Sequence, residues 1–148
     1  MSKAPDVKHG KVFEKHVHEA FRKLHLTYPI LWERVIDTHD AGNIISARDC
    51  DFKLVRDGRV MHIECKASTR YEHLHKSLVK PPQWGKFRLA ARAGVKVKIW
   101  FHSVKTGWVE VWDWDAAQEA NGKTLGFETA CHLLALPEMA EQLCKEKV

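Results

Sequence analysis

The sequence predicts an α/β protein in which a small mixed β-sheet is flanked by helices. Three observations support this prediction: a helical apolar stripe near the start, a hairpin signal within residues 50–66, and a helix followed by two alternating strands over residues 82–112. A chain of 148 residues is long enough to bury one core. No repeat or linker divides it, so we expect a single domain over residues 1–148.

The composition favours a soluble protein with a polyanionic partner. Hydrophobic residues make up 45% of the chain and charged residues 29%, which is ordinary for a globular domain. No apolar run has the length of a membrane span, and the start lacks a signal-peptide core, so we expect an intracellular, cytoplasmic protein without membrane contact. The four cysteines lack the spacing of a structural zinc site. The net charge of +5 favours nucleic acid as the partner.

The first element is predicted to be an amphipathic helix over residues 11–25. Its apolar stripe follows helical spacing through Phe13, Val17, Ala20, Phe21 and Leu24. Glu14 borders this stripe, so it either faces inward at the edge of the core or remains a solvated helix glutamate. An extended segment is expected over residues 28–36, followed by a polar loop over residues 37–43.

The strongest local signal is a β-hairpin centred on Asp57-Gly58. An Asp-Gly pair suits a type I′ turn, which requires positive φ at both central residues. If these two residues form the loop, Arg56 pairs with Arg59. Counting outward from that pair brings Asp51 opposite Glu64.

The two faces of this hairpin differ in character because successive side chains alternate. One face is apolar and suits a core: Phe52, Leu54, Met61, Ile63 and Cys65. The other face is polar: Asp51, Lys53, His62, Glu64 and Lys66. Opposed Cβ atoms lie about 4.5–5.5 Å apart, so the carboxylates of Asp51 and Glu64 repel unless a cation lies between them. The hairpin therefore predicts a divalent metal site.

A loop and a second helix follow the hairpin. Residues 67–80 have little periodicity and are predicted to be an exposed loop. Pro82 suits the first turn of a helix and Gly94 suits the position just past its end, so we expect a helix over residues 82–93.

Two strands and a helical end complete the prediction. Residues 95–102 and 108–112 alternate with the period of strands. The remainder, residues 113–148, contains an apolar segment from Phe127 to Leu136 and is predicted to be helical.

The hairpin residues resemble a known family. Asp51 followed by Glu64-Cys65-Lys66 resembles the PD-(D/E)XK nuclease motif, with Cys50 in the place of its proline. The stretch from Gly10 to Glu14 resembles the opening helix of Holliday-junction resolvases of the archaeal Hjc and RecU types. Ile63 to Ser68 resembles their second active-site strand.

The resemblance extends to the second helix. Pro82-Gln83 opens this helix, and Gln83 resembles the glutamine that many relatives have at this place. The resemblance covers about residues 9–112 and leaves residues 113–148 unmatched. It implies a restriction-endonuclease-like sandwich with a single nuclease domain. The implied activity is a magnesium-dependent endodeoxyribonuclease that hydrolyses phosphodiesters, with Mn²⁺ able to replace Mg²⁺.

The resemblance also implies roles for individual residues. The metal ligands would be Asp51, Glu64, the carbonyl of Cys65 and, directly or through water, Glu14. Lys66 would orient or help deprotonate the attacking water and offset developing negative charge, and Gln83 would position the site. Asp49 points to the same face as Asp51 and is the rival first acid. Magnesium prefers one or two carboxylates together with phosphate oxygens, which agrees with this set.

Basic residues near the proposed site are candidates for DNA phosphate contacts. Those on or before the first helix are Lys8, Lys11 and Lys15. Those in the loop after Lys66 are Arg70, His73, His75, Lys76 and Lys80. The alternative for each of these residues is an ordinary solvent-exposed charge with no role in DNA binding. If together they bind DNA, binding will depend steeply on salt.

A resolvase activity implies a homodimer, because two coordinated cuts in a branched DNA need two equivalent sites. Trp100, Trp112 and Trp114 are expected at the partner surface, or alternatively they cover the sheet beneath the C-terminal helices. Three other interpretations stay open. The first is a restriction- or repair-type endonuclease that acts on other DNA. The second is a DNA-binding module that does not cleave. The third is a fold in which Glu64 and Lys66 are merely a solvated pair.

Overall fold

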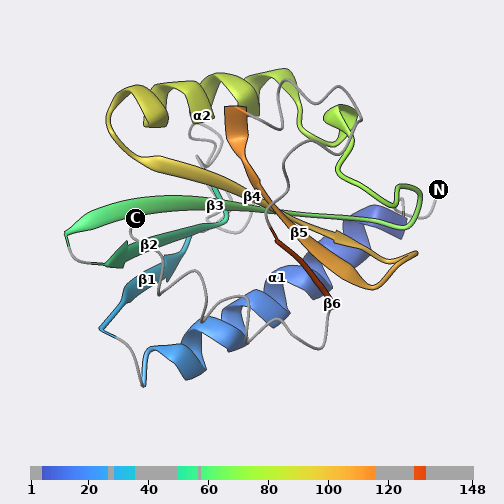
Figure 1. The fold of residues 1–148 in the computed structure, drawn as a ribbon, viewed down its shortest axis with the longest axis horizontal. Coiled ribbons are helices and arrows are strands. Elements are labelled where there is room, and N and C mark those ends of the chain that lie inside the picture. Colours follow the sequence, from blue (N-terminus) through green and yellow to red (C-terminus); the bar gives the residue numbers. More distant parts are fainter. Residues whose placement is uncertain (1–4, 27–28, 36–49, 57, 116–128, 133–148) are drawn as a thin grey trace, which may run out of the picture.

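A mixed β-sheet organises the residues that the computed structural model describes, namely 5–26, 29–35, 50–56, 58–115 and 129–132. Within these residues the sheet has six strands in the order β1-β2-β3-β4-β5-β6, and helices cover both of its faces (Figure 1). The elements are α1 (Pro5–Leu24), β1 (Leu31–Arg34), β2 (Phe52–Arg56), β3 (Arg59–Ser68), the 3₁₀ turn η1 (Lys76–Leu78), α2 (Pro81–Arg92), β4 (Lys96–Ser103), β5 (Trp108–Asp113) and β6 (Thr129–His132). The predicted α/β class is confirmed.

Strands β2 and β3 form the predicted hairpin in the predicted register. Arg56 pairs with Arg59, and Phe52 pairs with Ile63. Gly58 has a φ of 73°, a left-handed conformation that glycine adopts without a Cβ clash. Asp57 lies outside the described residues. Because a slip of one residue would exchange the two faces, this register decides which side chains reach each side of the sheet.

Helix α1 covers the apolar face of the hairpin. All five residues of the predicted helical stripe are buried, and they pack with Phe52, Leu54, Met61 and Ile63 in one cluster. The helix begins at Pro5, six residues before the predicted start at Lys11. The apolar period begins only at Phe13, so the stripe carries no signal for the first turns. Proline at the first helical position is compatible with such a start.

Helix α2 covers the opposite face. Trp84 and Phe87 pack with Val97, Ile99 and Phe101 in a second cluster. The helix starts at Pro81, one residue before the expected position, and Gly94 follows it with a φ of 90°. The parallel pairing of β3 with β4 and the antiparallel pairing of β4 with β5 make the sheet mixed.

The predicted surface position of two tryptophans is wrong. Trp100 and Trp112 are 0% and 1% exposed. Trp100 packs in the cluster under α1 and Trp112 in the cluster under α2, against which Trp114 is partly buried. Strand β4 lies inside a sheet with helices on both faces, so both sets of its alternating side chains are buried.

Two other local predictions are also corrected. Residues 129–132, predicted to be helical, form β6, in which Cys131 pairs with Val109 of β5. The unpaired backbone edge of β5 favours an added strand, and a short apolar run does not distinguish a strand from a helix. The segment 67–80 is only partly an exposed loop, because β3 continues to Ser68. Its Leu74 and Val79 are each 3% exposed.

The remaining predictions for residues 37–43, for 116–128 and for 133–148 lie outside the described residues. In the described part of the chain, no helix has both the length and the apolar character needed to span a membrane.

Candidate active site

Asp51, which directly precedes β2, makes hydrogen bonds on both sides of Glu64 in β3. The backbone N–H of Asp51 donates to the carbonyl of Ile63 at 3.1 Å. Its Oδ2 accepts a hydrogen bond from the backbone N–H of Cys65 at 2.7 Å. Asp51 is 1% exposed and Glu64 is 3% exposed. The hairpin therefore places two buried carboxylate side chains next to each other, one position beyond the last ladder pair. The rival acid Asp49 lies outside the described residues.

Gln83 joins Glu64 to Lys66. Its Nε2 donates to Glu64 Oε2 at 2.6 Å, and its Oε1 accepts from Lys66 Nζ at 3.1 Å. Lys66 Nζ also lies 3.5 Å from Glu64 Oε2, with side-chain exposures of 21% for the lysine and 4% for the glutamate. The structure thus brings three of the predicted site residues into one polar cluster on the α2 side of the sheet.

The start of α2 determines where Gln83 lies. Pro81 occupies the first helical position, which makes Gln83 the third residue of the helix and Lys80 the residue before it. Gln83 Oε1 accepts the backbone N–H of Lys80 at 3.2 Å, an interaction by which a side chain at this position satisfies an otherwise unpaired donor. The same amide therefore stabilises the helix end and contacts the site.

Glu14 of α1 faces inward, which is the first of the two alternatives left open by its place in the sequence. It is 6% exposed, and its Oε2 accepts a hydrogen bond from the Arg34 guanidinium at 2.9 Å. The residue after Arg34, Val35, donates its N–H to the carbonyl of Asp51 at 2.8 Å. Neighbouring residues at the end of β1 therefore link Glu14 and Asp51 indirectly, whereas Gln83 belongs to the helix on the opposite face of the sheet.

The donor set fits a magnesium ion that takes most of its ligands from water and substrate. Within the described residues, no group of three or more His, Cys, Asp or Glu side chains is arranged to hold a metal. However, magnesium in phosphate-transfer sites is commonly held by only one or two carboxylates together with phosphate oxygens. Glu64 Oε1 is buried and has no hydrogen-bond partner among the described residues. This orphan oxygen and the adjacent Asp51 are the available ligands.

The predicted DNA-contacting residues lie mainly at the surface. Those that are exposed are Lys8, Lys11, Lys15, Arg70, His73 and Lys80. His75 is partly buried, and the side chain of Lys76 lies outside the described residues. In the loop after β3, the Arg70 guanidinium lies 5.3 Å from the centroid of the Tyr71 ring. Tyr71 in turn stacks on His75 with centroids 4.3 Å apart. The structure therefore orders these loop side chains into a cationic and aromatic stack.

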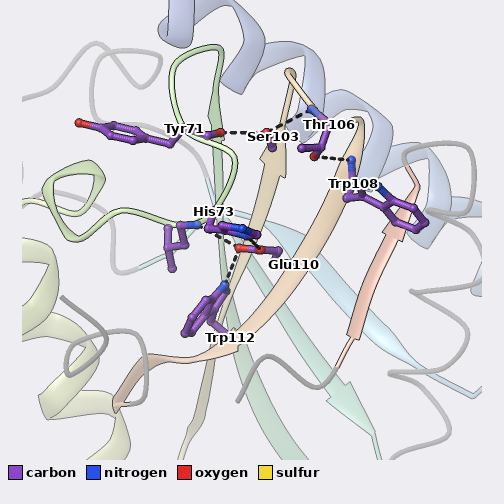
Figure 2. A network of polar contacts seen from close by, with 8 residues as sticks. Tyr71, His73, Ser103, Thr106, Trp108, Glu110 and Trp112 are labelled. Carbon is purple, nitrogen blue, oxygen red and sulfur yellow. Dashed lines mark hydrogen bonds and ion pairs between the residues drawn. The ribbon is translucent and has the colours of Figure 1, made fainter. Parts of the chain in front are cut away.

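Two residues that sequence reasoning did not select are tied to the predicted ones. Arg34 is the partner of Glu14, and Glu110 on β5 is the partner of His73 (Figure 2). The signal for Glu110 is an acidic residue between two valines and two tryptophans in the run Trp-Val-Glu-Val-Trp. No comparable local signal marks Arg34, because its pairing depends on the approach of α1 to β1.

Neither a protein-family model nor a curated protein matches this chain. A functional assignment therefore depends on the site's own residues. These are two neighbouring buried carboxylate residues, a lysine and the amide that joins this lysine to one of them.

Proposed function

We propose that the protein is a magnesium-dependent endodeoxyribonuclease of the PD-(D/E)XK type that cuts branched DNA as a Holliday-junction resolvase. One observation carries the proposal. Gln83 holds Glu64 and Lys66 in a single cluster, and Asp51 lies beside it on the paired strand segment. A solvated Glu64/Lys66 pair is not what the structure describes, because Glu64 is 3% exposed.

This arrangement has the parts that phosphodiester hydrolysis needs. Asp51 and Glu64 would hold the metal, which when bound supplies Lewis acidity and a more acidic water. Lys66 places a positive charge where negative charge develops on the phosphate, and it is available to orient the attacking water. Gln83 keeps the lysine and the carboxylate in fixed relative positions, which lowers the entropic part of the barrier.

The arrangement of layers supports the finer fold proposal, a restriction-endonuclease-like sandwich. The metal-binding hairpin β2–β3 leads through α2 into β4, which pairs in parallel with β3. The two helices cover opposite faces of the sheet (Figure 1). Such a sandwich presents one edge of the hairpin, with its carboxylates, next to the start of α2.

DNA affinity would come from the basic residues on α1 and in the loop after β3. The exposed members of the first set lie close to Glu14 along the chain, and those of the second set follow Lys66. They carry the positive charge that phosphate binding requires. We expect the affinity for DNA to fall steeply as salt increases, with a slope that scales with the number of phosphates contacted.

Resolution of a four-way junction also requires a second site. The described residues hold one Asp51/Glu64/Lys66 set, so we propose a two-fold homodimer that presents two equivalent sites. Trp100 and Trp112 are buried, so they do not form the surface through which two copies would meet. The proposal of a dimer therefore depends on the symmetry of the reaction.

The test compares a four-way junction, a flap and a linear duplex that share one labelled strand. Each DNA is incubated with the protein in magnesium, in manganese and in excess chelator, and the cuts are mapped on a sequencing gel. The Glu64→Gln variant, purified in parallel, controls for contaminating nucleases. We expect symmetric paired nicks in the junction, only with metal, and a dimer by light scattering.

Two results would change the assignment. Equal cutting of the linear duplex by a monomer would indicate a restriction- or repair-type endonuclease. Metal-independent binding without any cutting in magnesium or manganese would indicate a DNA-binding module that does not cleave.

A further inference from the structure

Glu110 on β5 is a buried carboxylate that holds a histidine outside the cluster of Glu64 and Lys66. It is 2% exposed. His73 Nδ1 lies 2.6 Å from its Oε2, and the backbone N–H of Leu74 and Nε1 of Trp112 each donate to its Oε1 at 3.0 Å. Figure 2 shows His73 and Trp112 approaching the carboxylate from different sides. Because an ionised carboxylate only accepts hydrogen bonds, Nδ1 of His73 is the donor to Glu110.

The Glu110–His73 pair lies on the same side of the sheet as the candidate active site. Lys66 pairs with Phe101 across β3 and β4, and Phe101 pairs with Glu110 across β4 and β5. Paired residues share a face of the sheet, so these three residues form one row. Neighbouring strands are about 4.8 Å apart, which places the backbones of Lys66 and Glu110 about 10 Å apart.

The loop that carries His73 is anchored to the sheet. Ser103 Oγ donates to the carbonyl of Tyr71 at 2.8 Å, and Leu74 is 3% exposed within the cluster under α2. His73 itself remains accessible, because its side chain is 49% exposed whereas that of Glu110 is 3% exposed. The structure thus fixes the ring before any ligand arrives, which reduces the entropy lost on binding.

We propose that His73 binds a second phosphate of the DNA strand that is cut, through Nε2, and that Glu110 is its positioning residue. Phosphates on one strand advance by about 3.4 Å along the helix axis. The separation of about 10 Å between the backbones of Lys66 and Glu110 therefore corresponds to a phosphate near the scissile one on the same strand. The contact requires the protonated ring, because only an imidazolium donates from both nitrogens, to the carboxylate behind the ring and to a phosphate in front of it. The assignment of the scissile position rests on the proposed nuclease function.

The experiment separates this contact from a structural role of the histidine. In His73→Asn the side-chain amide takes the place of Nδ1 and keeps a donor toward Glu110, but nothing reaches the place of Nε2. In His73→Ala both interactions are lost. Glu110→Gln removes the negative charge behind the ring. His16→Asn, a change at an exposed histidine of α1, is the matched control.

Binding of these variants to an uncut junction is measured in chelator over a range of salt concentrations, so that no cleavage is required. We expect His73→Asn and His73→Ala to weaken binding about tenfold, as for one lost charge-assisted hydrogen bond. Each should reduce the salt slope by about 0.9, the value for one phosphate contact. Glu110→Gln should change both quantities in the same direction, and His16→Asn should change neither. In magnesium, the His73 variants should raise KM while kcat stays near that of the wild type.

The outcome is decided by His73→Asn, whose folding is checked by circular dichroism and thermal melting. Wild-type affinity and slope in this variant would overturn the phosphate contact, even if His73→Ala binds poorly. The wild-type protein is assayed for cleavage in parallel. If it binds DNA but does not cut, the nuclease proposal fails while a changed slope in His73→Asn still supports the contact. If the wild type binds no DNA, both proposals fail.

Discussion

Gln83 donates a hydrogen bond to Glu64 at 2.6 Å, so the first turn of α2 restrains a carboxylate on β3. The oxygen of the same amide accepts from Lys66 at 3.1 Å. An amide carries a donor and an acceptor at one end and therefore bridges an anion and a cation. Neither a carboxylate nor an ammonium at position 83 would make both contacts.

Substitution of Gln83 should impair cleavage without abolishing DNA binding. In Gln83→Ala the two charged side chains lose their common partner, and we expect the single-turnover rate to fall about 10- to 100-fold through loss of positioning. Gln83→Glu should be worse, because it sets a second carboxylate against Glu64. Arg88→Ala, at an exposed position of α2, is the control. A Gln83→Ala rate equal to that of the wild type would show that the bridge has no part in the reaction.

Neutralising the charged residues of the proposed site should abolish cleavage. We expect Asp51→Asn, Glu64→Gln and Lys66→Ala each to lower the single-turnover rate by about 10³-fold or more, since each removes charge that acts on the reacting phosphate. DNA binding should persist, and the carboxylate variants should bind somewhat more tightly because repulsion of phosphates is removed. Titration calorimetry with magnesium should show weaker metal binding to Glu64→Gln than to the wild type.

The matched control for these variants is Glu33→Gln, which neutralises an exposed carboxylate of β1. Full activity in Asp51→Asn and Glu64→Gln would refute the site. If Asp49→Asn is inactive and Asp51→Asn is active, the first acid is Asp49.

Substitutions at the contact between Glu14 and Arg34 test whether Glu14 has a catalytic or a structural role. In Arg34→Ala the buried Glu14 loses the guanidinium 2.9 Å away, and we expect the free energy of unfolding in urea to fall by about 1 kcal/mol. Glu14→Gln should cost a similar amount, and the double variant should show a coupling energy of about 0.5 kcal/mol or more. If Glu14 serves the reaction, Glu14→Gln loses cleavage while Arg34→Ala retains most of it. If Glu14→Gln cleaves DNA as fast as Arg34→Ala does, Glu14 serves the fold alone.

Trp100 should contribute strongly to stability. It is fully buried under α1, so we expect Trp100→Ala to lower the free energy of unfolding by about 3–5 kcal/mol. Trp108, which is 46% exposed, provides the comparison, and Trp108→Ala should cost about 1 kcal/mol or less. Denaturant midpoints measure both. Similar losses in the two variants would contradict the burial of Trp100 in the protein in solution.

The sequence by itself determined the parts of this protein that depend on neighbours along the chain. The Asp57-Gly58 signal and the alternation of side chains predicted the pairing of Phe52 with Ile63. They also predicted that Asp51 and Glu64 come together. The stripe from Phe13 to Leu24 identified the buried face of α1. Turn chemistry and periodicity act over a few residues, so they are legible without any knowledge of the rest of the fold.

Only the tertiary structure decided features that arise between distant segments. Trp100 is buried because a helix covers each face of the sheet, and the pairing of Cys131 with Val109 makes a strand where periodicity indicated a helix. His73 reaches Glu110 across 37 positions of the chain. Such contacts depend on which surfaces meet when layers pack, and the free energy of that packing exceeds the weak local preferences that the sequence displays.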